Sequence, residues 1–401
     1  MSRAPLFLIL AIAVSSCVAE PPPGNPTRET LPNGAILVRY PDLPAIDSPG
    51  PEVTEAQVDL RFGSRDGTDR NLTFSDIRGI QATSNGDIYV LDYQAVEVRV
   101  FDPEGRYLRT IARRGRGPGE IVEANGILLS GDTLLWMHDH GQYMIIGVDP
   151  EGVEVRRFPK PVDEYGGYWS GKFDAKGRYW RETSHRDDAS TYADEGVNTN
   201  TAREYYKSYD LSSGAVDSVF LGANTSRSYS YIDAGGTGIL RIPFQSGNMS
   251  AVNPAGGIWH AHGTSYRITR TGEDGDTLLV IEAGLPVQRV TASDRSSYVE
   301  GMVERQPGLR RHAEAVAAVM PDVKPILTGL LVDDEGRLWV ERATPVEVPA
   351  FYDRFSEDGD YLGSVRLAFE PGRRVWVQHG NIYTWVEDEM DIPYVLRAPL
   401  S

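Results

Sequence analysis

Short runs with apolar side chains at every second position recur along this chain, and this alternation is the pattern of half-buried β-strands. The clearest runs surround Val90 and Val98. The sequence Asp-Pro-Glu-Gly at 102–105 follows them and favours a tight β-turn, because Asp, Pro and Gly each occupy a preferred turn position. This stretch therefore predicts four antiparallel strands, at 77–83, 87–92, 95–101 and 107–112.

The same arrangement of strands and turns recurs along the chain, giving six copies. A glycine opens the second strand of every copy, and these glycines are Gly86, Gly131, Gly177, Gly256, Gly336 and Gly380. A four-stranded unit of about 40–50 residues is typical of a blade of a β-propeller. Two intervals between copies are longer, and we attribute the excess to insertions at 185–203, 223–242 and 291–320 instead of an extra blade.

The sixth copy contains only three strands before the sequence ends. The segment AQVDLRFGS at 56–64 alternates as a strand and precedes the first complete copy. We expect it to supply the fourth strand of the last blade, which would remove a free sheet edge. The predicted fold is all-β: a six-bladed β-propeller of four-stranded antiparallel blades over residues 36–401, with its last blade closed by an N-terminal strand.

Residues 291–320 interrupt this β pattern and predict a short helical insertion between blades four and five. Thr291 followed by Asp294 fits a capping box at the start of a helix. Apolar residues then recur at helical spacing on both sides of Pro307-Gly308, which predicts two short helices. We interpret them as helices that pack on the propeller rim; the alternative is a mobile lid.

Three segments carry a resemblance to a known family: GIQATSNGDIYVLD at 79–92, VRVFDPEGRYLRTI at 98–111 and RRGRGPGE at 113–120. They resemble the six-bladed β-propellers of the NHL and TolB-like kind, and in particular the six-bladed propeller lipoproteins of bacteria. The resemblance extends over residues 56–400. It implies the fold but leaves the function open, because this fold occurs in binding proteins, lactonases, lyases and signalling modules.

The N-terminus has the pattern of a secretion signal over residues 1–16. Arg3 precedes an apolar run from Ala4 to Val14, which is too short to span a bilayer as a helix. The sequence Val-Ser-Ser-Cys at 14–17 resembles a bacterial lipobox, which implies cleavage before Cys17 and attachment of lipid to its sulfur. The alternative is an ordinary signal peptide with an incidental cysteine. Because Cys17 is the only cysteine, no disulfide can form within the chain.

Residues 17–35 are rich in proline and polar residues, and they predict a tether between the lipid and the domain. Val18, where some lipoproteins carry Asp, resembles the sorting pattern of outer-membrane lipoproteins. We therefore expect a lipoprotein of the bacterial outer membrane, with the domain in the periplasm or at the cell surface. The net charge of −17 argues against nucleic-acid binding, and the one basic cluster, at 113–117, is too small to change this expectation.

The predicted topology gathers the insertions on one face of the propeller. Within a blade, the loop between strands two and three and the loop to the next blade emerge on the same face. The three insertions and the segment at 113–120 all lie in such loops, so we call this side the loop face; long loops on one face are typical of a binding site. Its candidate ligand-binding residues are Asp92, Arg114, Arg116, Asp139, Glu182, His185 and Arg342.

Histidines near the ends of second strands raise the alternative of a metal site in the central funnel. The candidate ligands are His138, His140, His262 and Glu341, which suit Zn²⁺ or Ca²⁺. However, polar residues cap strand ends in any propeller, and no spacing here matches a known metal signature. We therefore expect no cofactor.

Two functions remain open. The first is a non-enzymatic lipoprotein that binds a protein, peptide or glycan on the loop face. The second is a metal-dependent hydrolase or lyase, as the resemblance to lactonase-like and amidating-lyase-like propellers implies. We favour binding, because these residues match neither family's motif one by one and the chain has no G-x-S-x-G nucleophile segment.

Overall fold

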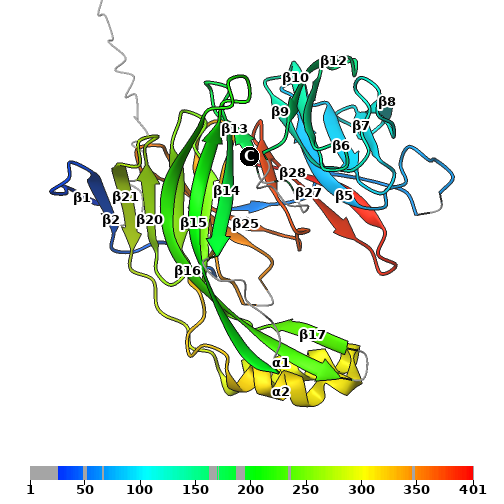
Figure 1. Ribbon diagram of the computed structural model, residues 1–401. Helices are drawn as coiled ribbons and strands as arrows, with labels where there is room; N and C mark the ends of the chain where they lie inside the picture. The colour runs from blue at the N-terminus through cyan, green and yellow to red at the C-terminus, as the bar shows by residue number, and fades with distance from the viewer. Residues whose placement is uncertain are drawn as a thin grey trace, which may run out of the picture.

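The strands of this chain form six sheets, which are the blades of a six-bladed β-propeller (Figure 1). The computed structural model describes residues 26–47, 52–65, 67–161, 169, 171–186, 195–233, 236–345 and 348–400. Cys17 and the predicted signal peptide lie outside this range.

Blades one and two are each built from four consecutive antiparallel strands. Blade one contains β5 (Ile77–Ala82), β6 (Ile88–Asp92), β7 (Glu97–Phe101) and β8 (Tyr107–Ala112). Blade two contains β9 (Ala124–Ser130), β10 (Leu134–Asp139), β11 (Met144–Val148) and β12 (Glu154–Pro159). The four strands predicted around Val90 are therefore confirmed.

The remaining blades vary this plan. Blade three contains β13 (Lys172–Phe173), β14 (Tyr179–Arg186), β15 (Gly196–Tyr209), β16 (Val216–Asp233) and β17 (Gly236–Arg241). Blade four contains β18 (Asn248–Val252), β19 (Ile258–His262), β20 (Arg267–Thr271) and β21 (Thr277–Ala283). Blade five contains β22 (Leu327–Val332), β23 (Leu338–Arg342), β24 (Phe351–Phe355) and β25 (Tyr361–Leu367), and blade six contains β26 (Trp376–Gln378), β27 (Asn381–Glu387) and β28 (Pro393–Pro399).

The six glycines that defined the repeat share one backbone conformation. Each lies in the turn between the first and second strands of its blade, and each has a positive φ, from 56° at Gly131 to 116° at Gly256. Residues with a side chain rarely adopt this region, so the turn requires glycine. The same constraint in every copy explains why glycine spacing predicted the number of blades.

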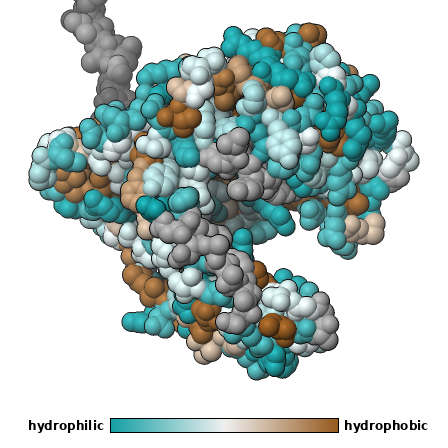
Figure 2. Space-filling model, viewed as in Figure 1, coloured by the Kyte–Doolittle hydropathy of each residue, from teal (hydrophilic) through white to brown (hydrophobic). Residues whose placement is uncertain are grey.

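The insertions form a projecting arm, whereas we expected the two helices to pack on the propeller rim (Figures 1 and 2). Residues 196–203 and 223–233, which belong to the first two insertions, are extensions of β15 and β16, and β17 pairs with the end of β16. The predicted helices are present as α1 (Ala292–Arg305) and α2 (Arg310–Ala318), and the capping box at Thr291 is formed. Both helices pack on the extended strands, where Tyr229 and Leu240 contact Val316.

We call these extended strands, with β17, α1 and α2, the arm. The helices pack on the arm and not on the rim because Tyr229, Tyr231 and Leu240 give one face of the strand extension an apolar surface. This surface covers the apolar sides of the helices. No helix within the described residues is both long and apolar enough to span a membrane.

The N-terminal segment adds outer strands to three successive blades. β1 (Thr27–Thr30) pairs with β2 (Ile36–Tyr40), and β2 runs parallel to β21 of blade four. β3 (Val53–Ala56) runs parallel to β25 of blade five. β4 (Leu60–Phe62) pairs antiparallel with β28 and is the fourth strand of blade six, as the pattern at 56–64 predicted. Sequence reasoning missed β1 to β3, and β1 lies within the stretch that it predicted as a tether. We call the segment from β1 to β4 the strap.

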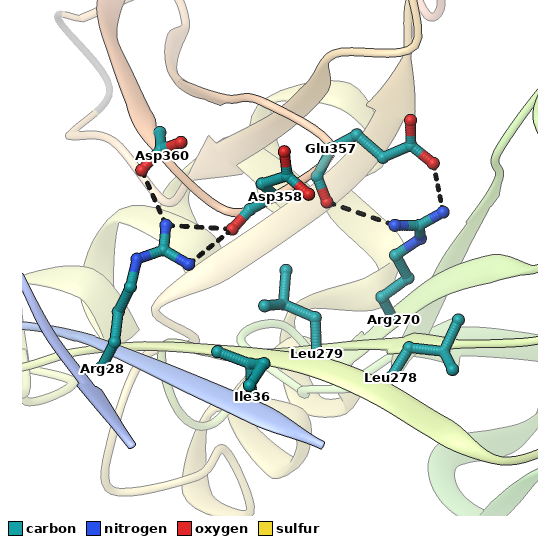
Figure 3. Close-up of a pocket in the computed structure, with 8 residues that line it drawn as sticks. All are labelled: Arg28, Ile36, Arg270, Leu278, Leu279, Glu357, Asp358 and Asp360. Atoms are coloured by element: carbon teal, nitrogen blue, oxygen red, sulfur yellow. Dashed lines mark hydrogen bonds and ion pairs between the residues drawn. The ribbon is translucent and has the colours of Figure 1, made fainter. Parts of the chain in front are cut away.

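The strap is held to the blades by both apolar and charged contacts. Tyr40 is buried, and its hydroxyl donates to the carbonyl of Gly359 and accepts from the N–H of Tyr361, each at 2.8 Å. A cavity of about 470 Å³ lies beside β1 and β2 (Figure 3). Arg28 crosses it to reach Asp360 at 2.7 Å, and Arg270 pairs there with Glu357. Arg28 and Arg270 are therefore each paired with a carboxylate, and the cavity marks the place where the strap meets blades four and five.

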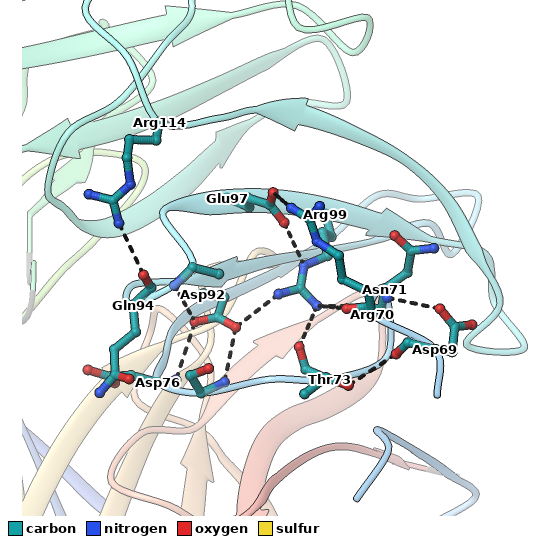
Figure 4. Close-up of polar contacts among 12 residues, drawn as sticks. Asp69, Arg70, Asn71, Thr73, Asp76, Asp92, Gln94, Glu97, Arg99 and Arg114 are labelled. Atoms are coloured by element: carbon teal, nitrogen blue, oxygen red, sulfur yellow. Dashed lines mark hydrogen bonds and ion pairs between the residues drawn. The ribbon is translucent and has the colours of Figure 1, made fainter. Parts of the chain in front are cut away.

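Buried aspartates hold the chain where it enters a blade (Figure 4). Asp92, at the end of β6, accepts N–H groups of Ser75 at 3.0 Å and Ala95 at 3.2 Å. It also pairs with the buried guanidinium of Arg99 at 2.9 Å. Asp139 has the same position in blade two and accepts the N–H groups of Val122 and Glu123, among others. The carboxylates therefore accept backbone N–H groups that find no carbonyl partner in the sheets.

Removing the strap should abolish cooperative folding. A chain that begins at residue 26 should unfold at the same temperature as the longer chain. A chain that begins at residue 65 loses the burial of Leu37, Val38 and Phe62, worth about 2 kcal/mol each, and it exposes three sheet edges. Thermal unfolding followed by circular dichroism tests this, and equal melting temperatures would show that the strap is dispensable.

The substitution Asp92→Ala should lower the free energy of unfolding by about 3 kcal/mol, because it leaves the buried Arg99 guanidinium without this carboxylate. The control is His262→Ala, since the His262 ring bonds only the nearby Thr264 hydroxyl, at 2.9 Å, within the described part of the chain. That change should cost less than about 1 kcal/mol. Urea denaturation measures both, and comparable losses would contradict the role assigned to Asp92.

Candidate functional site

The residues predicted for ligand binding do not form one site. Asp92 and Asp139 are buried and satisfied by the internal contacts described above. Arg342 is also buried, and it donates to both carboxylate oxygens of Asp353, at 2.6 and 2.7 Å. These three residues therefore connect strands within the protein and present no free group to a ligand. Sequence reasoning found them at strand ends, but it could not show that internal partners occupy them.

The other predicted residues are more accessible and come from two places, the loop between blades one and two and β14 of blade three. Arg114 is exposed and donates to the carbonyl of Gln94 at 3.3 Å. Arg116 is exposed on the loop between blades one and two, and His185 is exposed near the end of β14. Glu182 is partly buried, and burial raises its pKa while the Ser250 hydroxyl, at 3.0 Å, opposes that shift.

The four predicted metal ligands are not gathered around a common point. His138 is buried and stacks on Trp169, with 5.5 Å between ring centroids, and the ring of His140 lies beside Tyr143. Glu341 points into the central channel described below. Within the part of the chain that the structure describes, no three His, Cys, Asp or Glu side chains are grouped as a metal ion requires.

The loop face contains a recess between blades six and one. It has a volume of about 890 Å³ and is walled by the start of β5, the end of β27 and the loop between blades five and six. Arg373, Glu370 and Glu387 bring exposed charges of both signs to it. Figure 2 shows the surface hollowed between the arm and the blades above it. The recess and the arm together make the loop face concave.

A second cavity, of about 600 Å³, runs along the propeller axis, and we call it the channel. The inner strands of blades two to six line it, and it reaches the short turns opposite the loop face, at Gly131, Ala175 and Pro254. The segment Pro371–Arg373 lines both the channel and the recess, so this one loop separates them.

Two ionisable groups in the channel have perturbed pKa values. Burial, with the nearby positive charge of Arg374, lowers the pKa of Lys172 to about 8. Burial raises the pKa of Glu341, and a hydrogen bond from Thr328 opposes that shift. Perturbed groups inside a cavity are typical of functional sites, although structural ion pairs also cause such shifts.

Sequence reasoning named Glu341 but missed the other channel residues, for a structural reason. It examined the ends of second strands, whereas Lys172 and Trp376 belong to inner strands. β13 has only two residues and β26 only three, so the inner walls of blades three and six are short and their neighbouring loops line the channel. Both faces of an inner strand are enclosed, so polar positions do not alternate with apolar ones along it. The ends of such a strand are therefore not marked in the sequence.

Comparisons with known proteins agree on the fold alone. Residues 60–149, from β4 to β11, match the family model DUF5128, described as a 6-bladed beta-propeller. No curated protein matches the chain.

Solved structures resemble this chain only distantly. A DUF4221 family member from Bacteroides vulgatus is 11% identical, with a TM-score of 0.46, over 86% of this chain and 97% of that one. A calcium-binding regucalcin from Agrobacterium tumefaciens is 11% identical, with a TM-score of 0.37, over 86% and 96%. Virginiamycin B lyase from Staphylococcus aureus is 11% identical, with a TM-score of 0.38, over 82% and 96%. Such values carry no argument about ligand or reaction, and the chain is similar to propellers of several functions.

Proposed function

We propose that this chain is a binding protein of the bacterial cell envelope, and that its loop face holds an extended segment of a partner polypeptide. The observation that carries the proposal is the arm, which projects from blade three and stands over the hollowed loop face (Figures 1 and 2). The arm has its own apolar packing between strands and helices, and β15 and β16 continue from it into the sheet of blade three.

The arm offers chemistry that suits a polypeptide. β17 is the last strand of its sheet, and an edge strand can pair with a strand from another chain through backbone hydrogen bonds. Ile232 and Ile239 are 47% and 50% exposed and are diagonal neighbours on the face opposite the helices. A bound strand would therefore gain both backbone pairing and apolar contact.

A glycan is the weaker candidate for the same face. Glycans are bound largely through side-chain hydrogen bonds and aromatic surfaces, whereas the arm presents a strand edge and branched aliphatic side chains. The charges of Arg373, Glu370 and Glu387 in the recess suit the mixed side chains of a peptide.

We do not propose the metal-dependent hydrolase or lyase. Its four candidate ligands lie in different surroundings: His138 is under Trp169, His262 bonds Thr264, and Glu341 lines the channel. No specific contact among the described residues favours that function over binding.

The location in the envelope rests on the N-terminal sequence, and Cys17 is the lipid anchor in this proposal. The strap begins at β1, so the chain before it is the connection between lipid and propeller.

Charged residues on the arm should weaken peptide binding without unfolding the protein. A peptide selected from a display library on the full chain should bind at least tenfold more weakly to Ile239→Lys, because a charge at this edge opposes strand pairing and removes an apolar contact. Fluorescence anisotropy measures the affinity. The matched control is Leu108→Lys, at an exposed apolar position in blade one. Equal effects of the two substitutions, or none, would refute the assignment of the arm.

The substitution Cys17→Ser should release the protein from membranes or leave its signal peptide uncut, because the serine hydroxyl cannot replace the sulfur that accepts the lipid. Fractionation of cells and the migration of the protein on gels test this. A variant that fractionates and migrates like the parent would show that Cys17 is not an anchor.

A further inference from the structure

We propose that the channel binds a small organic anion, whose charged group lies between Lys172 and Arg373 and whose apolar body lies against Trp169 and Trp376. This site is separate from the polypeptide surface proposed for the loop face. It lies on the other side of the segment Pro371–Arg373, which lines both cavities.

The charged residues that line the channel are three cations and four carboxylates. Lys172, Arg373 and Arg374 all line it, although the chain as a whole has a net charge of −17. Lys172 is half-buried, and no carboxylate pairs with its ammonium group among the residues that the structure describes. A buried charge without a counter-charge is costly, and a bound anion would offset that cost.

The carboxylates that also line the channel already have partners of their own. Asp174 accepts from the side chains of Arg178 and Trp180, at 2.9 and 2.8 Å. Asp333 has the same arrangement with Arg337 and Trp339, at 2.7 and 2.9 Å. These two buried aspartates anchor turns, so they do not neutralise Lys172.

The two remaining acidic groups are also occupied or distant. Asp334 lies 3.1 Å from the imidazole of His379. Glu341 lies on β23 of blade five, where the Thr328 side chain forms a hydrogen bond with it. Lys172 comes from blade three, and Arg373 and Arg374 come from the loop before β26. The charge of Arg374 is near enough to Lys172 to lower its pKa.

Aromatic side chains beside these cations complete the site. Trp169 is buried, and its carbonyl accepts from Arg374 at 2.5 Å, which holds this arginine at the wall. Trp376 and Phe173 also line the channel. A cavity of about 600 Å³ is of the size that binds small molecules, and these aromatic side chains give part of its wall an apolar surface. An anion with a flat or aliphatic body fits this combination.

Calorimetric titration of the full chain, purified in detergent, tests the proposal with three probes of one shape. Benzoate and phenyl phosphate carry the anionic group, and benzamide is the neutral counterpart. At pH 7 we expect at least one of the anions to bind, and benzamide to bind at least tenfold more weakly. Absence of binding by both anions up to about 10 mM, or equal binding of benzamide, would overturn the proposal.

Two substitutions test whether the anion binds beside Lys172 and Arg373. Lys172→Met should weaken binding of the anion at least tenfold, and Arg373→Gln, at an exposed position that is safe for folding, should weaken it severalfold. The matched control is Lys176→Met, in the same blade, where the lysine pairs with Glu273 outside the channel. Unchanged affinity in the first two variants, or an equal loss in the control, would place the anion elsewhere and overturn the assignment.

The pH dependence of the affinity for the anion distinguishes a direct role of Lys172 from a structural one. Lys172 is charged below its pKa of about 8 and neutral above it, so the affinity for the anion should fall as the pH rises through that value. Bound anion favours the charged form, which moves the fall to somewhat higher pH. Lys172→Met should lose this dependence. An affinity that does not change between pH 7 and 10 in the parent protein would contradict the role of Lys172.

Discussion

Pairing between the strap and the outer strands of blades four, five and six is the interaction on which the rest of the structure depends. β2 and β3 extend two sheets by parallel pairing, and β4 completes the last blade. Phe62 of β4 then packs with Phe101 of blade one, with 4.7 Å between ring centroids, in a cluster that also contains Tyr383 of blade six. Without the strap, blade six has only three strands, and the outer strands of blades four and five expose unpaired backbone groups.

The arm and part of the channel wall follow from departures from the regular blade. Blade three has the shortest inner strand, β13, and the longest outer strands, β15 and β16. Lys172 of the short strand and the loop residues beside it line the channel, while the long strands carry the arm away from the same blade. Both surfaces that we propose to bind ligands thus border the blade that deviates most, and the regular blades serve as the frame that positions them.

Local signals in the sequence predicted much of the fold and little of the site. Gly86 and its five equivalents marked the blades because a positive φ strongly favours glycine, and Thr291 marked a helix start because its capping bonds are local. The missing fourth strand of the last copy pointed to β4, whereas blades four and five already have four strands and gave no reason to expect β2 and β3. Asp92 was read as a ligand contact because its internal donors come from a separate segment. Lys172 was missed because the sequence does not show that β13, the inner strand to which it belongs, has only two residues.

The strap also has a consequence for the order of events during synthesis. Leu37 pairs with Val280, and Phe62 pairs with Val395, so the strands made first wait for partners that are made last. Contacts between residues so distant in sequence close large loops and form slowly. The strap therefore cannot dock until the strands of blades four to six have been made, whereas blades one and two contain no strand from it. Docking of the earliest strands is then the last step that completes the fold.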